Sequence, residues 1–317
     1  MTIKSLRREY GEYISELAKT DNRIIALEGD LGEATQSVIF KNKNPKRHIE
    51  MGIAEQNMAG VAAGMAACGK IPIVHSFACF VSMRSCEQIR TSICYPNLNV
   101  KFLVTHGGVS AGSAGTTHHA LEDLAIMRSL PNMTVLVPGD VNEMKRVIDA
   151  SLSYKGPVYI RLAKEDVEDI FDETYKFNIG EAYTPVDGND GAIITTGTML
   201  GLGLEASSIL RNEYNLSIRV IHCASVKPID KEVIKKAAQE TKNIVTVEEH
   251  SIIGGLGGAV SEIVAETGNA RVKRVGILDR FCGVGSAPYL MEQEGLTVDN
   301  IISFMLTLKE CAPINSI

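Results

Sequence analysis

Short apolar runs alternate with helix-length segments along the first half of this 317-residue chain, and this alternation limits its fold more than any other feature. Strand-length apolar runs lie at 23–27, 71–74, 100–104, 134–138 and 157–161. The remaining segments predict helices at 3–19, 51–69, 82–94, from about 120, and at 141–153. Because strands alternate with helices of these lengths, the sequence predicts an α/β fold whose parallel sheet is covered on both faces.

A second α/β unit follows an acidic segment that is marked by Pro and Gly. Its predicted strands are 192–196, 217–221 and 243–247, and its predicted helices lie near 200–212, 230–241 and 255–267. The sequence therefore predicts one domain over residues 1–170, a linker over 171–190, and a smaller α/β domain over 191–317.

Charge and composition argue against several classes of protein. The formal net charge of -6, without a basic stripe, argues against binding to nucleic acid. The uncharged runs are too short to span a membrane, and the charged, amphipathic N-terminus does not resemble a signal peptide. The seven cysteines include no C-x-x-C pair, and Cys68, Cys79, Cys86 and Cys94 fall in segments predicted to be buried. Reduced core thiols in a cytoplasmic protein are favoured over a zinc site.

Glu55 is the only charged residue between Met51 and Gly69, and small residues surround it in the sequence. Alanines and glycines at this density predict a tightly packed helix that a second backbone or a flat ligand can approach closely. The dipole of the helix favours a carboxylate in its first turn, but loss of water should raise the pKa of that group. We therefore expect Glu55 to share a proton with another group; the simpler alternative is an acid that only complements the helix dipole.

Several polar side chains follow predicted strands or begin predicted helices, namely Asp30, Glu55, His75, His106 and His118. Because α/β proteins bind ligands at the carboxyl ends of parallel strands, this convergence predicts a site there. Any one histidine could be a structural residue. Three of them in the glycine-rich loop 106–119, with His119 as the third, favour a functional loop.

Two other patterns have a structural and a functional interpretation. Phe77 and Phe80 follow a predicted strand, where they can pack in the core or stack on a planar heterocycle. Glycine clusters at 201–203 and 254–258 have no acidic residue at the distance that a ribose contact requires. Close packing of helix against sheet is therefore favoured over nucleotide binding for both clusters.

Nine short motifs occur in a fixed order, at 28–31, 52–57, 76–80, 115–118, 131–133, 137–140, 156–157, 227–230 and 247–250. Together they resemble the transketolase family over nearly the whole chain, but only its C-terminal half. The resemblance implies a pyrimidine-binding domain in residues 1–170 and a transketolase C-terminal domain in 191–317. It also implies thiamine diphosphate as the cofactor.

The resemblance implies roles for residues beside the cofactor. Glu55 matches the glutamate that hydrogen-bonds N1′ of the aminopyrimidine ring, and a carboxyl group with a raised pKa can pass a proton to that ring. Phe77 and Phe80 match aromatic residues that line the pyrimidine pocket. Asp30 matches an aspartate that lies beside the cofactor.

It also implies roles for residues that contact substrate. His106 and His118 match histidines that contact the donor sugar near its reacting carbons. Arg7 and Lys164 fall near positions where the family binds substrate phosphate with arginine, and Arg161 is a competing candidate. Lys in place of Arg would hold a phosphate with looser geometry.

The chain departs from the family pattern around the donor sugar. Ser113 and Ala114 stand where acidic residues are usual, and His119 stands where Gln is usual. Gly107 replaces an aspartate that often distinguishes donor stereochemistry, and Met83 replaces a common pocket tyrosine. These departures bear on the identity of the donor more than on the cofactor.

The family's diphosphate and Mg²⁺ motif, Gly-Asp-Gly followed further along by Asn, is missing from this chain. A diphosphate needs a metal ion and backbone donors to hold it. The resemblance therefore implies the C-terminal subunit of a split transketolase, whose N-terminal partner subunit supplies the diphosphate-binding domain and holds Mg²⁺. Because the family's sites lie at a two-fold interface, we expect a heterotetramer with two subunits of each kind.

The implied reaction is transfer of a two-carbon ketol unit from a ketose or ketose phosphate to an aldose. Two alternatives lie within thiamine chemistry: the β subunit of a 2-oxo acid dehydrogenase, and a fragment like 1-deoxyxylulose-5-phosphate synthase. A non-catalytic scaffold or regulatory subunit is the alternative from another class.

Overall fold

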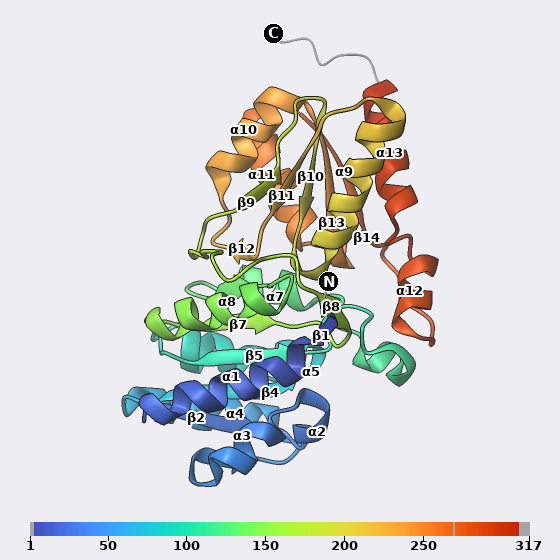
Figure 1. The fold of residues 1–317 in the computed structure, drawn as a ribbon. Helices are drawn as coiled ribbons and strands as arrows, with labels where there is room; N and C mark the ends of the chain where they lie inside the picture. The colour runs from blue at the N-terminus through green and yellow to red at the C-terminus, as the bar shows by residue number, and fades with distance from the viewer. Residues whose placement is uncertain (1–2, 269, 311–317) are drawn as a thin grey trace.

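The apolar runs of the first half pair side by side in the computed structural model, which describes residues 3–268 and 270–310 (Figure 1). They form a seven-stranded sheet in the order β12-β6-β7-β5-β4-β2-β3, and every neighbouring pair is parallel except β12 with β6. The strands are β2 (Ile24–Glu28), β3 (His48–Glu50), β4 (Ile71–Phe77), β5 (Lys101–Thr105), β6 (Thr134–Leu136), β7 (Val158–Arg161) and β12 (Ser225–Lys227). The predicted α/β fold is confirmed.

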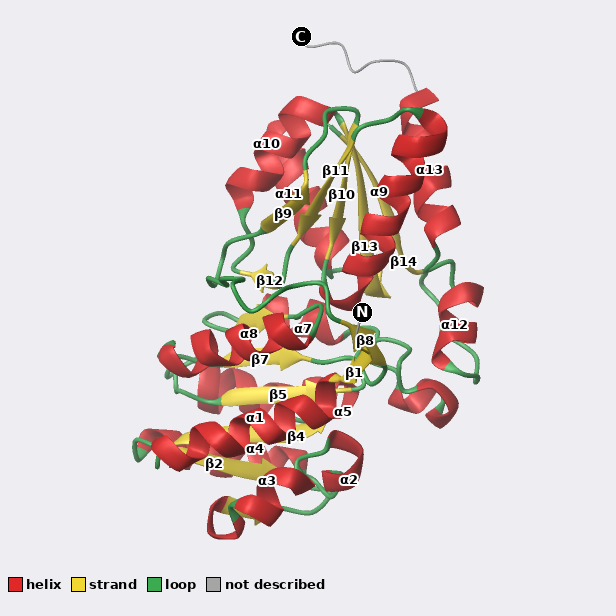
Figure 2. Cartoon of the chain, in the orientation of Figure 1, coloured by secondary structure: helices red, strands yellow, loops and turns green. Residues whose placement is uncertain are grey.

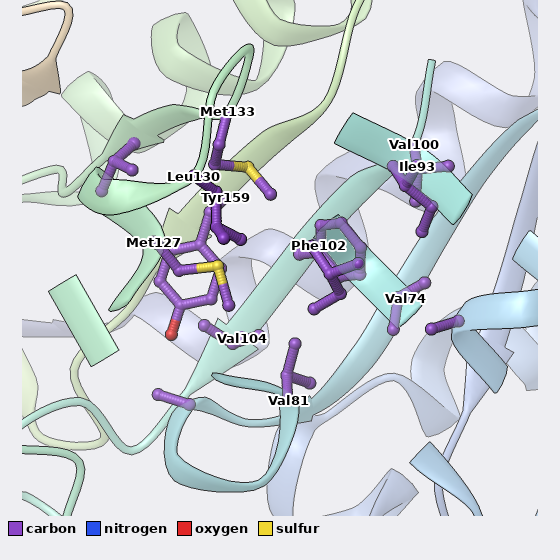
Figure 3. Packing of buried hydrophobic residues seen from close by; sticks show 14 of the residues in the cluster. Val74, Val81, Ile93, Val100, Phe102, Val104, Met127, Leu130, Met133 and Tyr159 are labelled. Atoms are coloured by element: carbon purple, nitrogen blue, oxygen red, sulfur yellow. The ribbon is translucent and has the colours of Figure 1, made fainter. Parts of the chain in front are cut away.

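Helices cover both faces of this sheet because its central strands are buried on both sides. One face carries α1 (Leu6–Thr20), α3 (Val38–Lys43) and α8 (Val141–Ser153). The other carries α4 (Glu55–Ala67), α5 (Ala78–Arg84), α7 (Asp123–Ser129) and the π-helical turn η2 (Ile89–Cys94). Shorter turns are α2 (Gly32–Thr35), α6 (Cys86–Gln88), η1 (Pro45–Arg47), η3 (Gly112–Ala114) and η4 (Thr116–His118). Figure 3 shows Phe102 of β5 packed beside Val74 of β4 and Ile93 of η2, in the core between the sheet and the helices of this second face.

The second half forms a five-stranded sheet in the order β14-β13-β10-β11-β9, parallel except for the edge strand β9 (Figure 2). Its strands are β9 (Tyr183–Val186), β10 (Gly191–Thr195), β11 (Ile218–His222), β13 (Asn243–Ser251) and β14 (Arg271–Ile277). One face packs on α9 (Leu200–Tyr214), α12 (Ala287–Gln293) and α13 (Val298–Glu310). The other face packs on α10 (Lys231–Thr241) and α11 (Leu256–Thr267), and the turn η5 (Gly197–Met199) precedes α9.

The strands β3 and β14 were not predicted from the sequence, and neither were four other strands. β12 comes from the second half but pairs with β6, so it extends the first sheet. β8 (Asp166–Glu168) pairs with β1 (Ile3–Ser5) in a separate antiparallel ladder. The segment 171–190, predicted to be a linker, contains β9 and therefore contributes an edge strand to the second sheet.

Local contacts explain where other predictions differ from the structure. The helix predicted over 3–19 begins only at Leu6, because residues 3–5 pair with β8 and the Ser5 hydroxyl caps the helix. The helix predicted over 82–94 is divided into α5, α6 and η2. Cys68 is exposed, and Cys86 is only partly buried, so the prediction of burial was wrong for Cys68. Cys68 lies past the last turn of α4, where the chain turns outward before β4.

The close packing predicted for the two glycine clusters is confirmed at Gly203 and Gly255. A Cβ on Gly203 would come within 2.7 Å of the Thr195 side chain. A Cβ on Gly255 would overlap the carboxylate of Glu248, which caps α11 by accepting a hydrogen bond from the N–H of Gly257 (2.7 Å). These glycines let a helix approach its sheet.

Asp140 joins the start of α8 to the segment that follows the first domain, so a substitution there tests how much this contact stabilises the fold. Its buried carboxylate accepts hydrogen bonds from the N–H groups of Glu143 (2.8 Å), Ile170 (2.7 Å) and Phe171 (2.7 Å). We predict that Asp140→Ala lowers the free energy of unfolding by about 2–4 kcal/mol, because buried donors lose their acceptor. Asp230 caps α10 from a partly exposed position, and Asp230→Ala should cost only about 1 kcal/mol. Urea unfolding measures both, and equal losses would contradict the prediction.

The burial of His75 makes the free energy of unfolding depend on pH. It is fully buried in β4, shares a hydrogen bond with the Leu27 carbonyl (3.1 Å), and burial lowers its pKa to about 3. The unfolded chain protonates this histidine below about pH 6.5, so the residue makes stability fall with acidification by up to about 1.4 kcal/mol per pH unit.

We predict that His75→Gln removes this contribution between about pH 3 and 6.5, which are the folded and unfolded pKa values. Urea unfolding at several values from about pH 5 to 6.5 should give a shallower slope of unfolding free energy against pH than the parent chain. A slope equal to that of the parent chain would show that His75 is already protonated in the folded state.

Candidate active site

Two of the predicted site residues lie in loops that follow strands of the first sheet, at its carboxyl edge. Asp30 lies just past β2 and His106 directly follows β5, each with a φ of 61°. This left-handed backbone is rare outside glycine and often occurs at functional sites. The Glu50 carboxylate ties two of the loops together by accepting hydrogen bonds from the N–H groups of Asp30 (2.9 Å) and Gly52 (3.0 Å).

Glu55 begins α4 at this edge, and only 4% of its surface is exposed. Its Oε1 forms an ion pair with Nη1 of Arg84 at 3.0 Å, and the guanidinium carbon of Arg84 lies 3.9 Å from the centroid of the Phe80 ring. A single cation therefore connects the buried acid to the aromatic side chains. Sequence reasoning missed Arg84, although no other Lys, Arg, Asp or Glu occurs between Lys70 and Glu87.

Four of the predicted side chains form one aromatic cluster. The Phe77 ring stacks on His106 with centroids 3.8 Å apart, and the Phe80 ring meets His118 edge-on at 5.2 Å. The two phenylalanine rings lie 5.6 Å apart. Phe77 is buried within the core and Phe80 is only partly buried, so the cluster presents a flat apolar surface beside imidazole nitrogens.

The charges of Arg7 and Lys164 both act on His106. The Nε of Arg7 donates a hydrogen bond to the Lys164 carbonyl at 3.2 Å, which joins residues from opposite ends of the first domain. Burial lowers the pKa of His106 to about 3, and the charges of Arg7, Lys164 and His118 act in the same direction. The imidazole of His106 is therefore neutral at physiological pH, with its Nδ1 hydrogen-bonded to the Thr105 hydroxyl (2.8 Å).

Arg161 does not join this group. Its Nε pairs with the Asp123 carboxylate at 3.0 Å, and its Nη2 donates hydrogen bonds to the carbonyls of Ala120 (3.3 Å) and Glu249 (2.7 Å). The same carboxylate of Asp123 accepts a hydrogen bond from the Tyr159 hydroxyl (2.8 Å). Arg161 is 4% exposed, so the structure places it in a buried network between the two domains.

Two further histidines of the predicted group also lie away from the cluster. The sequence predicted that His75 follows a strand, but β4 continues to Phe77 and encloses His75 beside the Tyr10 ring. His119 is buried, and its Nε2 shares a hydrogen bond with the Gly112 carbonyl at 3.4 Å. The glycine-rich loop thus directs two of its three histidines, His106 and His118, to the cluster.

Nothing in residues 3–268 and 270–310 resembles a metal centre, because these residues contain no group of three or more His, Cys, Asp or Glu able to hold an ion. The helices of the described chain are also too short or too polar to cross a membrane.

Comparisons with known proteins agree with this geometry. Two family models match: "Transketolase, pyrimidine binding domain" over residues 4–169, and "Transketolase, C-terminal domain" over 180–301. A Methanocaldococcus jannaschii protein, provisionally described as a transketolase C-terminal section, is 44% identical over 301 residues, which cover 94% of each chain.

Two further relatives carry the names of defined enzymes. A 6-deoxy-6-sulfo-D-fructose transketolase subunit of Clostridium sp. (strain MSTE9) is 40% identical, with 94% of this chain and 92% of that protein covered. One of the subunits of an apulose-4-phosphate transketolase of Phocaeicola vulgatus is 36% identical, with 93% and 94% covered.

Solved structures share the fold. The chain matches one described as "Split gene transketolase, inactive beta4 tetramer" with a TM-score of 0.89 and 41% identity, over 97% of this chain and 100% of that one. It also matches 47% of a Campylobacter jejuni transketolase, over 96% of its own length, with a TM-score of 0.81 and 19% identity. The second match indicates a common fold only.

The two sheets and the two matching family models define an α/β transferase subunit of the transketolase type. The chain belongs to the transketolase family, whose enzymes depend on thiamine diphosphate, and it corresponds to the family's C-terminal half.

The different surroundings of Arg161 and Lys164 lead to a stability prediction. Arg161→Ala should lower the free energy of unfolding by about 3–5 kcal/mol, because it leaves the Asp123 carboxylate buried without its cation. Lys164→Ala should cost less than about 1 kcal/mol, since Lys164 is partly exposed. Urea unfolding of the purified chain measures both variants. A loss for Arg161→Ala as small as that for Lys164→Ala would show that Arg161 does not join the domains.

Proposed function

We propose that this chain is the C-terminal subunit of a split, thiamine-diphosphate-dependent transketolase that transfers a two-carbon ketol unit from a ketose donor to an aldose acceptor. One observation carries the proposal. A buried carboxylate, Glu55, starts a helix of small residues and is joined through Arg84 to the cluster of Phe77, Phe80 and two histidines.

The residues at this edge fit the pyrimidine ring of thiamine diphosphate. The buried carboxyl group of Glu55 can hold a proton at ring atom N1′, and the half-buried face of Phe80 suits a planar heterocycle. Asp30 lies on the neighbouring loop, where its sharp turn is fixed by Glu50. When bound, the cofactor supplies the nucleophilic carbon that attacks the donor carbonyl.

His106 and His118 act on the donor sugar in this proposal. Because His106 stays neutral, its imidazole can accept a hydrogen bond from a sugar hydroxyl or donate one to it, without introducing charge. His118 is only partly buried and meets the Phe80 ring edge-on, so its imidazole can form a hydrogen bond with a second hydroxyl. The hydrophobic rings between them limit the access of water to both imidazoles.

Arg7 and Lys164 suit an anionic group at the far end of the substrate. Both charges act on His106, so an anion bound by these two cations would also act on the imidazole. Relatives named for a sulfonated and for a phosphorylated sugar make a sulfonate or phosphate ester the expected group. A side chain at Gly107 would overlap the guanidinium of Arg161, so this chain cannot use the aspartate that the family often places there.

A separate subunit is proposed to hold the diphosphate and Mg²⁺, in an assembly with two subunits of each kind. The missing Gly-Asp-Gly motif supports this, as does the lack of a metal-binding cluster in the described part of the chain. The solved relative that assembles from β chains is itself described as inactive. Relatives named 1-deoxy-D-xylulose-5-phosphate synthase are about twice as long as this chain, since it covers 45–48% of their length.

Glu55→Gln in the reconstituted two-subunit enzyme tests the proposal. It should lower kcat by at least about 100-fold, the usual contribution of a proton-transferring group, while affinity for the partner subunit changes little. The matched control is Glu87→Gln, an exposed acid in α6, which should keep kcat within about 2-fold. Ketol transfer from phosphorylated and sulfonated ketoses gives kcat, and sedimentation gives partner affinity. Full activity of Glu55→Gln would remove the assignment.

A further inference from the structure

A cleft of about 760 Å³ lies between the end of the first domain and the helices α9 and α12 of the second. Segment 163–170 forms one wall, and η5, the start of α9 and two residues of α12 form the other. The side chains of Ser110 and Glu249 reach it from the loop after β5 and from β13. This volume is within the range of small-molecule sites, about 300–1,000 Å³.

The lining of the cleft combines hydrocarbon with negative charge. Its apolar side chains include Val167, Ile170, Met199, Leu202, Leu204 and Met291. Its acidic side chains are Glu165, Asp166, Glu168, Asp169, Glu205 and Glu249, and no Lys, Arg or His is among the described residues that line it. Lys4 pairs with one oxygen of Asp169 at 2.6 Å, while the other oxygen of Asp169 has no hydrogen-bond partner.

Glu249 is the buried member of this group. It is 6% exposed, and its Oε1 has no hydrogen-bond partner in the structure. Its side chain packs against Gly108, where a Cβ would lie 2.5 Å from the carboxylate. Arg161 donates a hydrogen bond to the backbone carbonyl of Glu249 (2.7 Å), and its charge, together with the N–H groups of Val109 and Ser110, acts to lower the pKa of the Glu249 carboxyl group. Burial outweighs these contributions and raises the pKa of Glu249 to about 7, so a further cation in the cleft would favour its charged form.

One wall of the cleft contains a glycine, Gly201, with free space beside it. A Cβ on Gly201, at the start of α9, would meet no atom within 4 Å, whereas Gly203 two residues later packs tightly on the sheet. A side chain placed at Gly201 can therefore enter the cleft without displacing the helix. This position allows the cleft to be filled by substitution.

We propose that this cleft binds a small amphipathic cation, an organic ammonium group with a hydrocarbon chain. The ammonium group lies among the carboxylates, with Glu249 at the buried end of the cleft. The hydrocarbon chain of the ligand packs on the apolar side chains of α9 and α12. Ala163 and Glu165, which line the cleft, are the chain neighbours of Lys164. Binding of this cation does not depend on the proposed ketol transfer.

Isothermal titration of the full-length chain with octylammonium tests the proposal. We expect a Kd below about 1 mM, at least about 10-fold tighter than for octanoate or ethylammonium, which lack the positive charge or the long chain. Gly201→Met should weaken octylammonium binding about 10-fold or more by filling the cleft, and Glu249→Gln should weaken it to a similar degree by removing the buried carboxylate.

The matched control is Glu266→Gln, an exposed acid on α11 outside the cleft, which should leave the Kd unchanged. Thermal unfolding identifies any variant that has lost its fold, and Glu205→Gln then replaces it. Octylammonium binding that is absent, equal to that of octanoate, or unaffected by both cleft substitutions would overturn the proposal. None of these readouts uses ketol transfer, so the proposed function succeeds or fails separately.

Discussion

The ion pair between Arg161 and Asp123 is the contact on which the arrangement of the site depends. It is buried at the junction of the two sheets, and Arg161 also holds the carbonyls of Ala120 and Glu249. Ala120 closes the glycine-rich loop through a backbone bridge to Gly108, so the loop that carries His106 is anchored at both ends. Because a buried arginine is stable only with its acceptors in place, the network holds loop, first sheet and second domain in one geometry.

Burial sets the chemistry of the side chains that this network positions. His106 and His75 both lose affinity for protons because their charged forms would lie in an apolar interior. Around His106 the charges of Arg7 and Lys164 act in the same direction, so the imidazole remains a neutral hydrogen-bonding group. Glu55 keeps its charged partner Arg84 at the surface, where the guanidinium also covers Phe80. Acid, aromatic rings and neutral imidazole thus occupy one sheet edge.

The strands β2, β4, β5 and β7 of the first sheet were predictable because they are buried and therefore appear as continuous apolar runs. The edge strand β3 is partly exposed and was missed. The segment 141–153 matches α8 throughout, since Asp140 caps it and its apolar side chains repeat with helical period. β8, β9 and β12 were missed because short edge strands carry little apolar periodicity and exist only through their pairing partners. The division of segment 82–94 into α5, α6 and η2 likewise left no sign in its composition.

The sequence by itself determined the alternating α/β plan, the small-residue helix with a single acid at its start, and the order of motifs that matches the transketolase family. Only the tertiary structure decided which charged groups meet. It paired Glu55 with Arg84 and placed Arg7 beside Lys164, but it buried Arg161 against Asp123. The reason is physical: spacing along a chain fixes local conformation, whereas ion pairs form between residues that distant elements bring together when they pack.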